Sequence, residues 1–394
     1  MKTKTLGAGL LIVGTCIGAA MLTLPITTAT SGFVPSLLLL AGTWLLMLYT
    51  GFLVVEVNLQ CPEGSNFFTM AKDKLGHWGK YTVLTIYIGL LYSLMAAYET
   101  GGGALATGIL QTLTHHPIPH WFGDLVITLL FASVIFFGTQ AADYINRFFI
   151  IGLFLTYLCL MLTTLPHMHV QYLSHGHANY LITAMPLFFT AYGFHIVIPT
   201  LRQYLNSNIK QIKIALLFGS TLCFIIYFFW QLAIFGVVPA TGKNSLQGIL
   251  NSGQPSTHLT MALSELLKSH WITTFSTFFT FFALGTSFVG VSLSLFDFLM
   301  DTLTLSANTK GRLSAVSIAF VPPFIFAWLY PKGFILALGY AGVFVAILHG
   351  IMPAAMAWIG RRQQQAITYL TPGGSIGLAM VMLLSLVVIV AEFL

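Results

Sequence analysis

The stretch Gly14-Thr-Cys-Ile-Gly-Ala-Ala20 interrupts the first apolar segment of the chain, which runs from about residue 6 to 31. That segment is long enough to span a bilayer, which takes about 20 apolar residues. Its two glycines weaken the helix where a simple membrane anchor would carry leucine or isoleucine. Because lipid cannot hydrogen-bond the backbone groups that a break exposes, those groups must face protein, water or a polar ligand. The stretch therefore predicts a broken transmembrane helix with a binding site at the break.

The composition places the whole chain in a membrane. Of 394 residues, 57% are hydrophobic and only 7% are charged, whereas a soluble domain has about 25% charged residues. We therefore expect an all-α, polytopic membrane protein. The net charge of +6 does not indicate a nucleic-acid partner, because the basic residues lie in short loops between apolar spans. No signal peptide is evident. Three of the four cysteines lie inside apolar spans, so we expect no disulfide framework.

Hydropathy windows of about 20 residues predict eleven spans. Their approximate ranges are 6–31, 33–58, 80–112, 122–138, 144–165, 178–201, 213–238, 270–303, 312–330, 334–358 and 374–393. With the N-terminus inside, thirteen of the sixteen Lys and Arg residues fall on the inner side, and only Lys243, Lys268 and Lys332 fall outside. The excess of positive charge on one side predicts a cytoplasmic N-terminus and a C-terminus on the opposite side.

The sixth predicted span carries a second interruption, Pro186-Leu-Phe-Phe-Thr-Ala-Tyr-Gly-Phe-His195, followed by Pro199. Proline and Gly193 weaken the helix, and His195 places a polar ring near the middle of the membrane. The two interrupted spans are five spans apart and therefore run in opposite directions. Interrupted spans at matching positions of two halves are typical of inverted-repeat transporters.

Several motifs give the chain a resemblance to a known family. They are Gly14 to Pro25, Asn146-Arg-Phe148, Ala191-Tyr-Gly-Phe-His195, Phe229-Trp-Gln-Leu232, Thr286-Ser-Phe288 with Leu295-Phe-Asp297, and Tyr330-Pro-Lys-Gly333 with Ala337-Leu-Gly-Tyr-Ala-Gly342. The chain resembles the hydroxy and aromatic amino acid permeases of the amino acid–polyamine–organocation superfamily. Within this family the bacterial tyrosine-specific permeases are the nearest branch, with the tryptophan permeases behind them.

The resemblance implies a LeuT-like fold with helices 1 and 6 broken. Two inverted repeats of five helices would occupy residues 6–165 and 178–358, and an eleventh helix residues 374–393. It also implies proton-driven import of an aromatic amino acid, tyrosine foremost, across the bacterial inner membrane, with no cofactor. Three alternatives stay open: a tryptophan or serine/threonine substrate, sodium coupling, and a membrane-embedded metalloenzyme. Against the enzyme, nine of the twelve histidines fall in predicted outer loops and no HExxH motif is present.

A broken helix offers a partner to each charged group of an amino acid. The first amides of the outer half-helix present N–H donors and a positive dipole end, which suit a carboxylate. Carbonyls at the end of the inner half-helix suit an ammonium group, and the resemblance adds carbonyls of the sixth span. The predicted groups are the amides of Gly18, Ala19 and Ala20, and the carbonyls of Thr15, Cys16, Phe189 and Tyr192, with Gly18 and Gly193 allowing close approach.

An aromatic substrate also needs an apolar, ring-lined pocket. Candidates for this pocket lie beside the second interruption and in the third span: Phe188, Phe189, Tyr192, Phe194, Tyr92 and Met95. A phenolic substrate would further need a partner for its hydroxyl. Candidates for that partner are Glu99, Thr190 and Ser287.

Ionisable side chains at membrane depth are few, and each is a functional candidate because a buried charge costs at least about 2.5 kcal/mol on insertion scales. Glu99 lies centrally in the third span and His195 follows the second interruption. We rank these two level as proton-coupling groups and Asp297 behind them. Asp297 and Glu56 lie nearer the inner face, where we expect pairing with an Arg or Lys, or a gate. If sodium were the coupling ion, Thr286 and Ser287 would join the carbonyls of the first span.

Overall fold

A computed structural model describes residues 3–174, 176, 181–242, 244–252, 255–306, 308–363 and 369–394. Within these ranges the regular structure is entirely helical. Ten helices are long and apolar enough to cross a membrane, or eleven if the bent pair at the N-terminus counts as one span. The prediction of an all-α polytopic protein is therefore confirmed. Lys2, Lys243, His175, His177 and the first three residues of the predicted sixth span lie outside the described residues.

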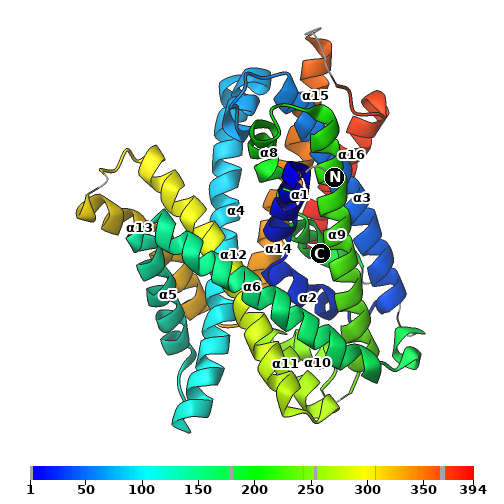
Figure 1. The fold of residues 1–394 in the computed structure, drawn as a ribbon, viewed down its shortest axis with the longest axis vertical. Coiled ribbons are helices and arrows are strands. Elements are labelled where there is room, and N and C mark those ends of the chain that lie inside the picture. The colour runs from blue at the N-terminus through cyan, green and yellow to red at the C-terminus, as the bar shows by residue number, and fades with distance from the viewer. Residues whose placement is uncertain are drawn as a thin grey trace.

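The spans follow the chain in order (Figure 1). They are α1 (Thr3–Cys16) with α2 (Ala19–Thr27), α3 (Phe33–Leu59), α4 (Phe67–Thr114), α5 (His120–Phe137), α6 (Thr139–Thr164), α7 (Met185–Ala191) with η5 (Phe194–Val197) and α8 (Ile198–Tyr204), α9 (Ile209–Val237), α12 (His270–Thr302), α13 (Thr309–Leu329), α14 (Phe334–Val345) with η6 (Ala346–Ile351) and α15 (Met352–Arg362), and α16 (Gly374–Ala391). Short helices connect them: η1 (Leu165–His167), η2 (Val170–Ser174), η4 (Ile182–Ala184), α10 (Leu246–Ser252) and α11 (Pro255–Leu267).

Two elements differ from the sequence-based spans. Helix α4 begins at Phe67 rather than near residue 80, with Asn66 capping it by accepting from the Thr69 amide at 3.0 Å. A left-handed glycine, Gly76 (φ 72°), kinks its first turns away from the apolar part. The connection between α9 and α12 folds into α10 and α11, which pack against α2. Hydropathy missed these helices because they are short or polar rather than long and apolar.

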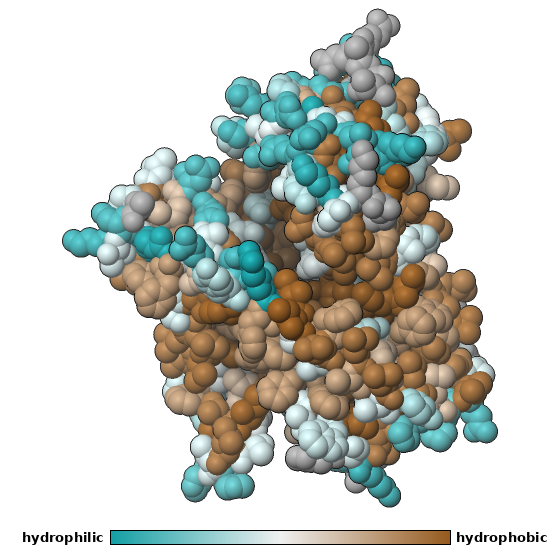
Figure 2. Space-filling model, viewed as in Figure 1, coloured by the Kyte–Doolittle hydropathy of each residue, from teal (hydrophilic) through white to brown (hydrophobic). Residues whose placement is uncertain are grey.

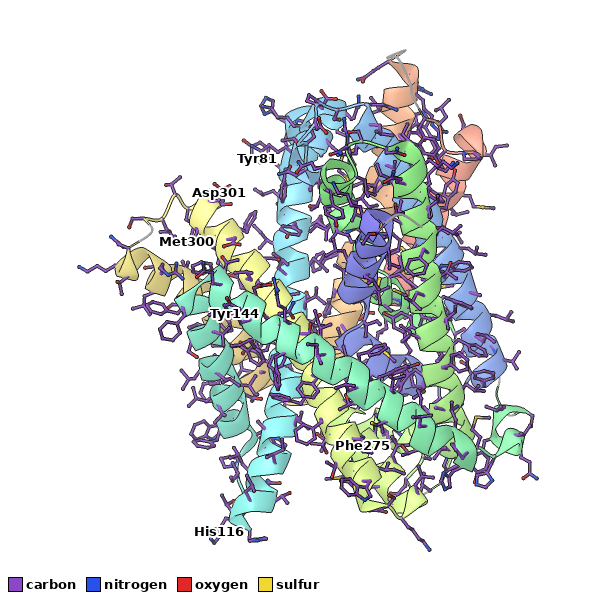
Figure 3. All side chains as sticks on the ribbon, viewed as in Figure 1. Tyr81, His116, Tyr144, Phe275, Met300 and Asp301 are labelled. Carbon is purple, nitrogen blue, oxygen red and sulfur yellow. The ribbon has the colours of Figure 1, made fainter. Side chains whose placement is uncertain are left out.

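The helices form two groups on either side of α4 (Figure 1). One group contains α5, α6, α12 and α13, in which α6 packs along α12. The other contains α1, α3, α9 and α16, in which α1 and α3 both pack on α9. Figure 2 shows the surface hollowed between the two groups. The hollow opens at the end of the molecule where Tyr81 and Asp301 lie, opposite His116 (Figure 3).

An ion pair between a buried glutamate and a partly buried arginine ties α3 to α15 at the same end. Arg361 Nε donates to Glu56 Oε1 at 2.7 Å, and its Nη2 donates to Oε2 at 2.8 Å. The amide of Thr371, in the segment before α16, also donates to Glu56 Oε2 at 2.7 Å. The expectation that Glu56 pairs with an arginine or lysine is therefore confirmed. Asp297 is exposed on α12, within the electrostatic reach of Arg312.

Candidate functional site

The first break lies where the sequence predicted it. Helices α1 and α2 meet at an angle of 58°, and Gly18 between them is fully extended (φ −172°, ψ −153°). A Cβ on Gly18 would overlap the Ser287 hydroxyl of α12 and lie 3.2 Å from Ser287 Cβ. The requirement for glycine here is therefore spatial, because α12 approaches the backbone too closely for any side chain.

The second break separates α7 from α8. Helix α7 ends at Ala191, Tyr192 leaves the helical region (φ −114°, ψ 36°), and the short 3-10 helix η5 follows Gly193. Proline explains the part of the break next to α8, because Pro199 has no N–H to donate to the carbonyl of His195, four residues earlier. The amide of Ile198 bonds that carbonyl instead, in the tighter 3-10 pattern.

Tyr227 of α9 joins the two breaks, and sequence reasoning missed it. Its hydroxyl lies 2.6 Å from the carbonyl oxygen of Cys16, the last residue of α1, and 2.9 Å from that of Ala191, the last residue of α7. Both carbonyls are among those that a helix end leaves without an intrahelical donor. The one sequence signal was a phenol in the middle of a largely apolar span.

The breaks are reached from one end of the molecule. Gly14 and Thr15 are exposed, whereas every residue from Gly18 to Ile26 is buried. A Cβ on Gly14 or on Gly290 of α12 would meet nothing within 4 Å, so open space surrounds this face of α1. By contrast α2, the helix that follows the first break, is covered by α10, α11 and α12. The hollow of Figure 2 therefore leads toward the first break, and its opposite end is closed.

Four of the residues predicted to line an aromatic pocket belong to the second break. Phe188, Phe189, Tyr192 and Phe194 are all buried, and the ring of Tyr192 packs edge-on against Tyr227 at 5.4 Å. The Tyr192 hydroxyl has no hydrogen-bond partner among the described residues.

Three further residues proposed for the pocket or for the substrate hydroxyl, Met95, Thr190 and Tyr92, have different surroundings. Met95 is buried in α4. Thr190 uses its hydroxyl on the carbonyls of Pro186 and Leu338, at 3.1 and 3.3 Å. The hydroxyl of Tyr92 donates to the Ile318 carbonyl of α13 at 2.8 Å, which turns that ring away from the breaks.

Glu99 faces α5 rather than the breaks. It is fully buried, both of its carboxyl oxygens lack a hydrogen-bond partner among the described residues, and the neighbouring polar groups are Thr128 and Asp124 of α5. The close approach follows from Gly103, one turn after Glu99, because a Cβ there would overlap the Asp124 carboxyl. Sequence reasoning missed Asp124, although a carboxylate inside an apolar span was a visible signal.

His195 lies beside the second break and stacks on His349 of η6. The ring centroids are 4.5 Å apart and the rings are 17° from parallel. His195 Nε2 lies 2.8 Å from the Thr50 hydroxyl of α3. Sequence reasoning did not single out His349, since nothing local distinguishes a histidine that faces another buried histidine from one that faces lipid.

The two hydroxyl residues proposed for a sodium site, Thr286 and Ser287, contact different helices. The hydroxyl of Thr286 donates to Asn146 Oδ1 of α6 at 2.7 Å. Ser287, one residue later, lies against Gly18. Of the two, only Ser287 lies beside the first break.

The sequence matches the model of the tryptophan/tyrosine permease family over residues 1–392. Tyrosine-specific transport system 1 of Haemophilus influenzae is 36% identical over 98% of this chain and 95% of its own length. The corresponding values are 32%, 100% and 97% for tyrosine-specific transport system 2, and 31%, 98% and 95% for the tryptophan-specific transport protein, both of the same organism. The apolar helices of this chain, together with its permease relatives, show that it is a multi-pass membrane protein. The chain belongs to the tryptophan/tyrosine permease family.

Proposed function

We propose that this protein is not an enzyme but a secondary transporter that imports an aromatic amino acid, tyrosine foremost, by proton symport. The observation that carries the proposal is the meeting of two helix breaks at Tyr227, next to buried aromatic rings and at the end of a hollow. Backbone breaks inside the membrane-spanning part are tolerated where they line a cavity or bind a ligand. Relatives named for tyrosine and tryptophan transport support an aromatic substrate.

In this proposal the substrate carboxylate lies at the start of α2. The first amides of a helix have no intrahelical acceptor, and no side chain caps this helix. The amides of Gly18, Ala19 and Ala20 would thus hold the carboxylate, assisted by the positive end of the helix dipole. The ammonium group would contact the carbonyls near Thr15, Cys16 and Tyr192. Because Tyr227 already donates to Cys16, its hydroxyl would have to share or yield that oxygen when substrate binds.

We place the substrate ring against Phe189, Tyr192 and Phe194, the buried rings of the second break. The unpartnered hydroxyl of Tyr192 is a candidate for bonding a phenolic substrate. Tyr92 takes no part in this proposal, because its hydroxyl is committed to α13.

The architecture that fits this function is a LeuT-like pair of inverted repeats. Residues 6–165 would form the first repeat, residues 178–358 the second, and α16 an added helix. The breaks lie in corresponding spans of the two halves, which supports the assignment. With the N-terminus cytoplasmic, the hollow would open toward the cytoplasm, and we assign this arrangement to an inward-open state of an alternating-access cycle in the bacterial inner membrane.

Uptake into proteoliposomes tests the substrate and the ion together. The protein should accumulate radiolabelled tyrosine when the interior is made alkaline, without any sodium gradient. Unlabelled tyrosine should compete, followed by phenylalanine and tryptophan. Accumulation that follows an imposed sodium gradient and ignores the proton gradient would replace the proton with sodium. Competition by tryptophan alone would move the protein to the tryptophan branch of the family.

A further inference from the structure

We propose that His195 and His349 together form the proton-binding site of this transporter, adjacent to the second helix break. This inference rests on the proposed transport function and adds to it a residue pair from two spans. The two rings lie face to face, with centroids 4.5 Å apart, and Phe194 stacks on His195 at 4.7 Å.

The sequence around the two histidines follows one pattern. His195-Ile-Val-Ile-Pro199 and His349-Gly-Ile-Met-Pro353 each place a proline four residues after the histidine. Proline has no N–H, so each histidine carbonyl loses its α-helical donor and the helix departs from regular geometry. The first departure is the 3-10 helix η5 and the second is the π-helix η6. Short 3-10 stretches inside helices often mark hinges and π-bulges are frequent at functional sites, and here both meet at one point.

The hydrogen bonds leave one nitrogen of His195 as a free acceptor. Thr50 has a single hydroxyl proton, which it donates to the Met47 carbonyl at 3.1 Å. Both contacts of this hydroxyl are made together when its oxygen accepts from His195 Nε2, so we assign the proton to Nε2. Nδ1 of His195 then carries a lone pair and has no partner among the described residues.

Neither nitrogen of His349 has a hydrogen-bond partner among the described residues, although only 2% of the residue is exposed. A neutral imidazole carries one N–H donor and one acceptor, and leaving such groups unpaired in an apolar interior is costly. Three nitrogens of the two stacked imidazoles therefore lack a hydrogen-bond partner among the described residues. This arrangement stabilises the fold poorly, but it is suited to receiving a proton.

The surroundings limit the pair to one proton. Thr50 and the Met47 carbonyl face it from α3, and Phe67 of α4 lies 6.0 Å from the His349 ring. The titratable group that faces His195 directly is His349, whose ring stacks on it. Glu56, the carboxylate of α3, is occupied by Arg361. Two imidazolium rings stacked this closely would repel each other, so loading both is excluded.

Position links this proton to the substrate. His349 Cε1 lies 4.0 Å from where a Cβ on Gly193 would stand, at the second break itself. In the proposed cycle one imidazole nitrogen takes a proton from the outer water, holds it as imidazolium, and returns it to the inner water, so no other bond forms or breaks. A cation at this depth is costly by itself, and Phe194, against which we place the substrate ring, stacks on His195. Binding of the amino acid would therefore change the surroundings of the imidazolium, which couples the two binding events.

The test uses the purified full-length protein in proteoliposomes, with His349→Gln, His195→Gln and an exposed control, His77→Gln. Three measurements are made: tyrosine counterflow without any ion gradient, accumulation driven by an alkaline interior, and the pH of the external medium when tyrosine is added. We expect His349→Gln to retain counterflow but to lose accumulation by about tenfold or more, the size of a typical coupling between two sites. Wild-type protein should alkalinise the external medium when tyrosine is added, and His349→Gln should not. His77→Gln should match the wild type in all three measurements.

Thr50→Val provides a second test if a histidine variant fails to insert. It removes the acceptor for His195 Nε2 and leaves both rings in place, so we expect the pH at which tyrosine affinity is half-maximal to change. Normal proton-driven accumulation by both histidine variants would overturn the proposal. Loss of accumulation in Glu99→Gln alone would transfer the role to Glu99. If wild-type protein exchanges neither tyrosine nor tryptophan, the proposed function itself fails, and this inference with it.

Discussion

The hydroxyl of Tyr227 stands between two helix ends that are separated by 175 residues of sequence, from Cys16 to Ala191. The hydroxyl has one proton for two carbonyl oxygens, so each of the two hydrogen bonds is weaker than an unshared one. A substrate ammonium group could take over one of these oxygens at little cost, because the other would retain the phenol. Tyr227 is thus suited to hold the empty site together without blocking it.

Replacing Tyr227 by phenylalanine should weaken both the protein and its transport. The change leaves two buried carbonyls without this donor, which costs about 1–3 kcal/mol. We expect a lower thermal unfolding midpoint in detergent and a slower maximal tyrosine uptake. Tyr157→Phe is the matched control, since that hydroxyl donates to the Ile226 carbonyl of the same helix and to neither helix end at the breaks. Equal losses of uptake in the two variants would show that Tyr227 has no special role at the breaks.

Substituting Gly18 by alanine should impair uptake through a collision with one neighbour. The added methyl group overlaps the Ser287 hydroxyl, and overpacking of this kind costs about 1–3 kcal/mol. The double variant Gly18→Ala with Ser287→Ala removes the overlapping oxygen and leaves a contact of 3.2 Å to Cβ. We therefore expect the double variant to recover part of the tyrosine uptake, with Ser287→Ala alone as the reference. No recovery would mean that Gly18 is needed for another reason, such as direct contact with substrate.

At the scale of elements, the Glu56–Arg361 pair holds α3, α15 and the segment before α16 together at one end of the bundle. Glu56 is fully buried and Arg361 also donates to the Thr371 carbonyl at 2.9 Å. Such a pair contributes little compared with a well-packed apolar contact, but breaking it leaves a buried charge.

Removing one partner of this pair should therefore be more damaging than removing both. We expect Arg361→Met to destabilise the protein by about 3–5 kcal/mol and Glu56→Leu with Arg361→Met to recover much of that loss. The free energy can be followed by thermal unfolding in detergent for both single variants and the double variant. Arg147, whose side chain pairs with Asp143 on an exposed face at 2.9 Å, provides the control, and Arg147→Met should change stability little. A double variant as unstable as the sum of its parts would contradict this account.

At the scale of the whole molecule, the hollow determines from which side of the membrane the first break is accessible. Thr15, near the end of α1, is exposed, and Leu113 is exposed at the far end of α4. With Cys159 replaced by alanine, a hydrophilic maleimide should label Thr15→Cys from the cytoplasmic side and Leu113→Cys from the periplasmic side. Labelling can be compared in inverted vesicles and intact cells. Labelling of both positions from the same side would overturn either the orientation or the inward-open assignment.

Saturating tyrosine should also slow the labelling of Thr15→Cys and leave that of Leu113→Cys unchanged. The reason is that bound substrate would lie over the end of α1, next to residue 15. An unchanged labelling rate would place the substrate elsewhere in the bundle.

The sequence by itself determined the helical class, the approximate spans and the position of both breaks. These properties are local, because each apolar stretch must satisfy its own backbone within the bilayer, and glycine and proline act on the residues beside them. The pairing of Glu56 with a basic residue also followed, since a carboxylate near a basic face of the bundle needs a nearby cation. The family resemblance was carried by motifs spread along the chain, and the family match confirms it.

Only the tertiary structure decided which side chains meet across the spans. Glu99 faces Asp124, Tyr92 faces α13, and His195 meets His349, a residue 154 positions away. A helix that is apolar on every side gives no periodic signal of its rotation about its own axis. That rotation is set by the small residues that let neighbouring helices approach, such as Gly18 against Ser287 and Gly103 against Asp124. The polar contacts of the site therefore depend on packing between distant segments, which hydropathy along the chain does not record.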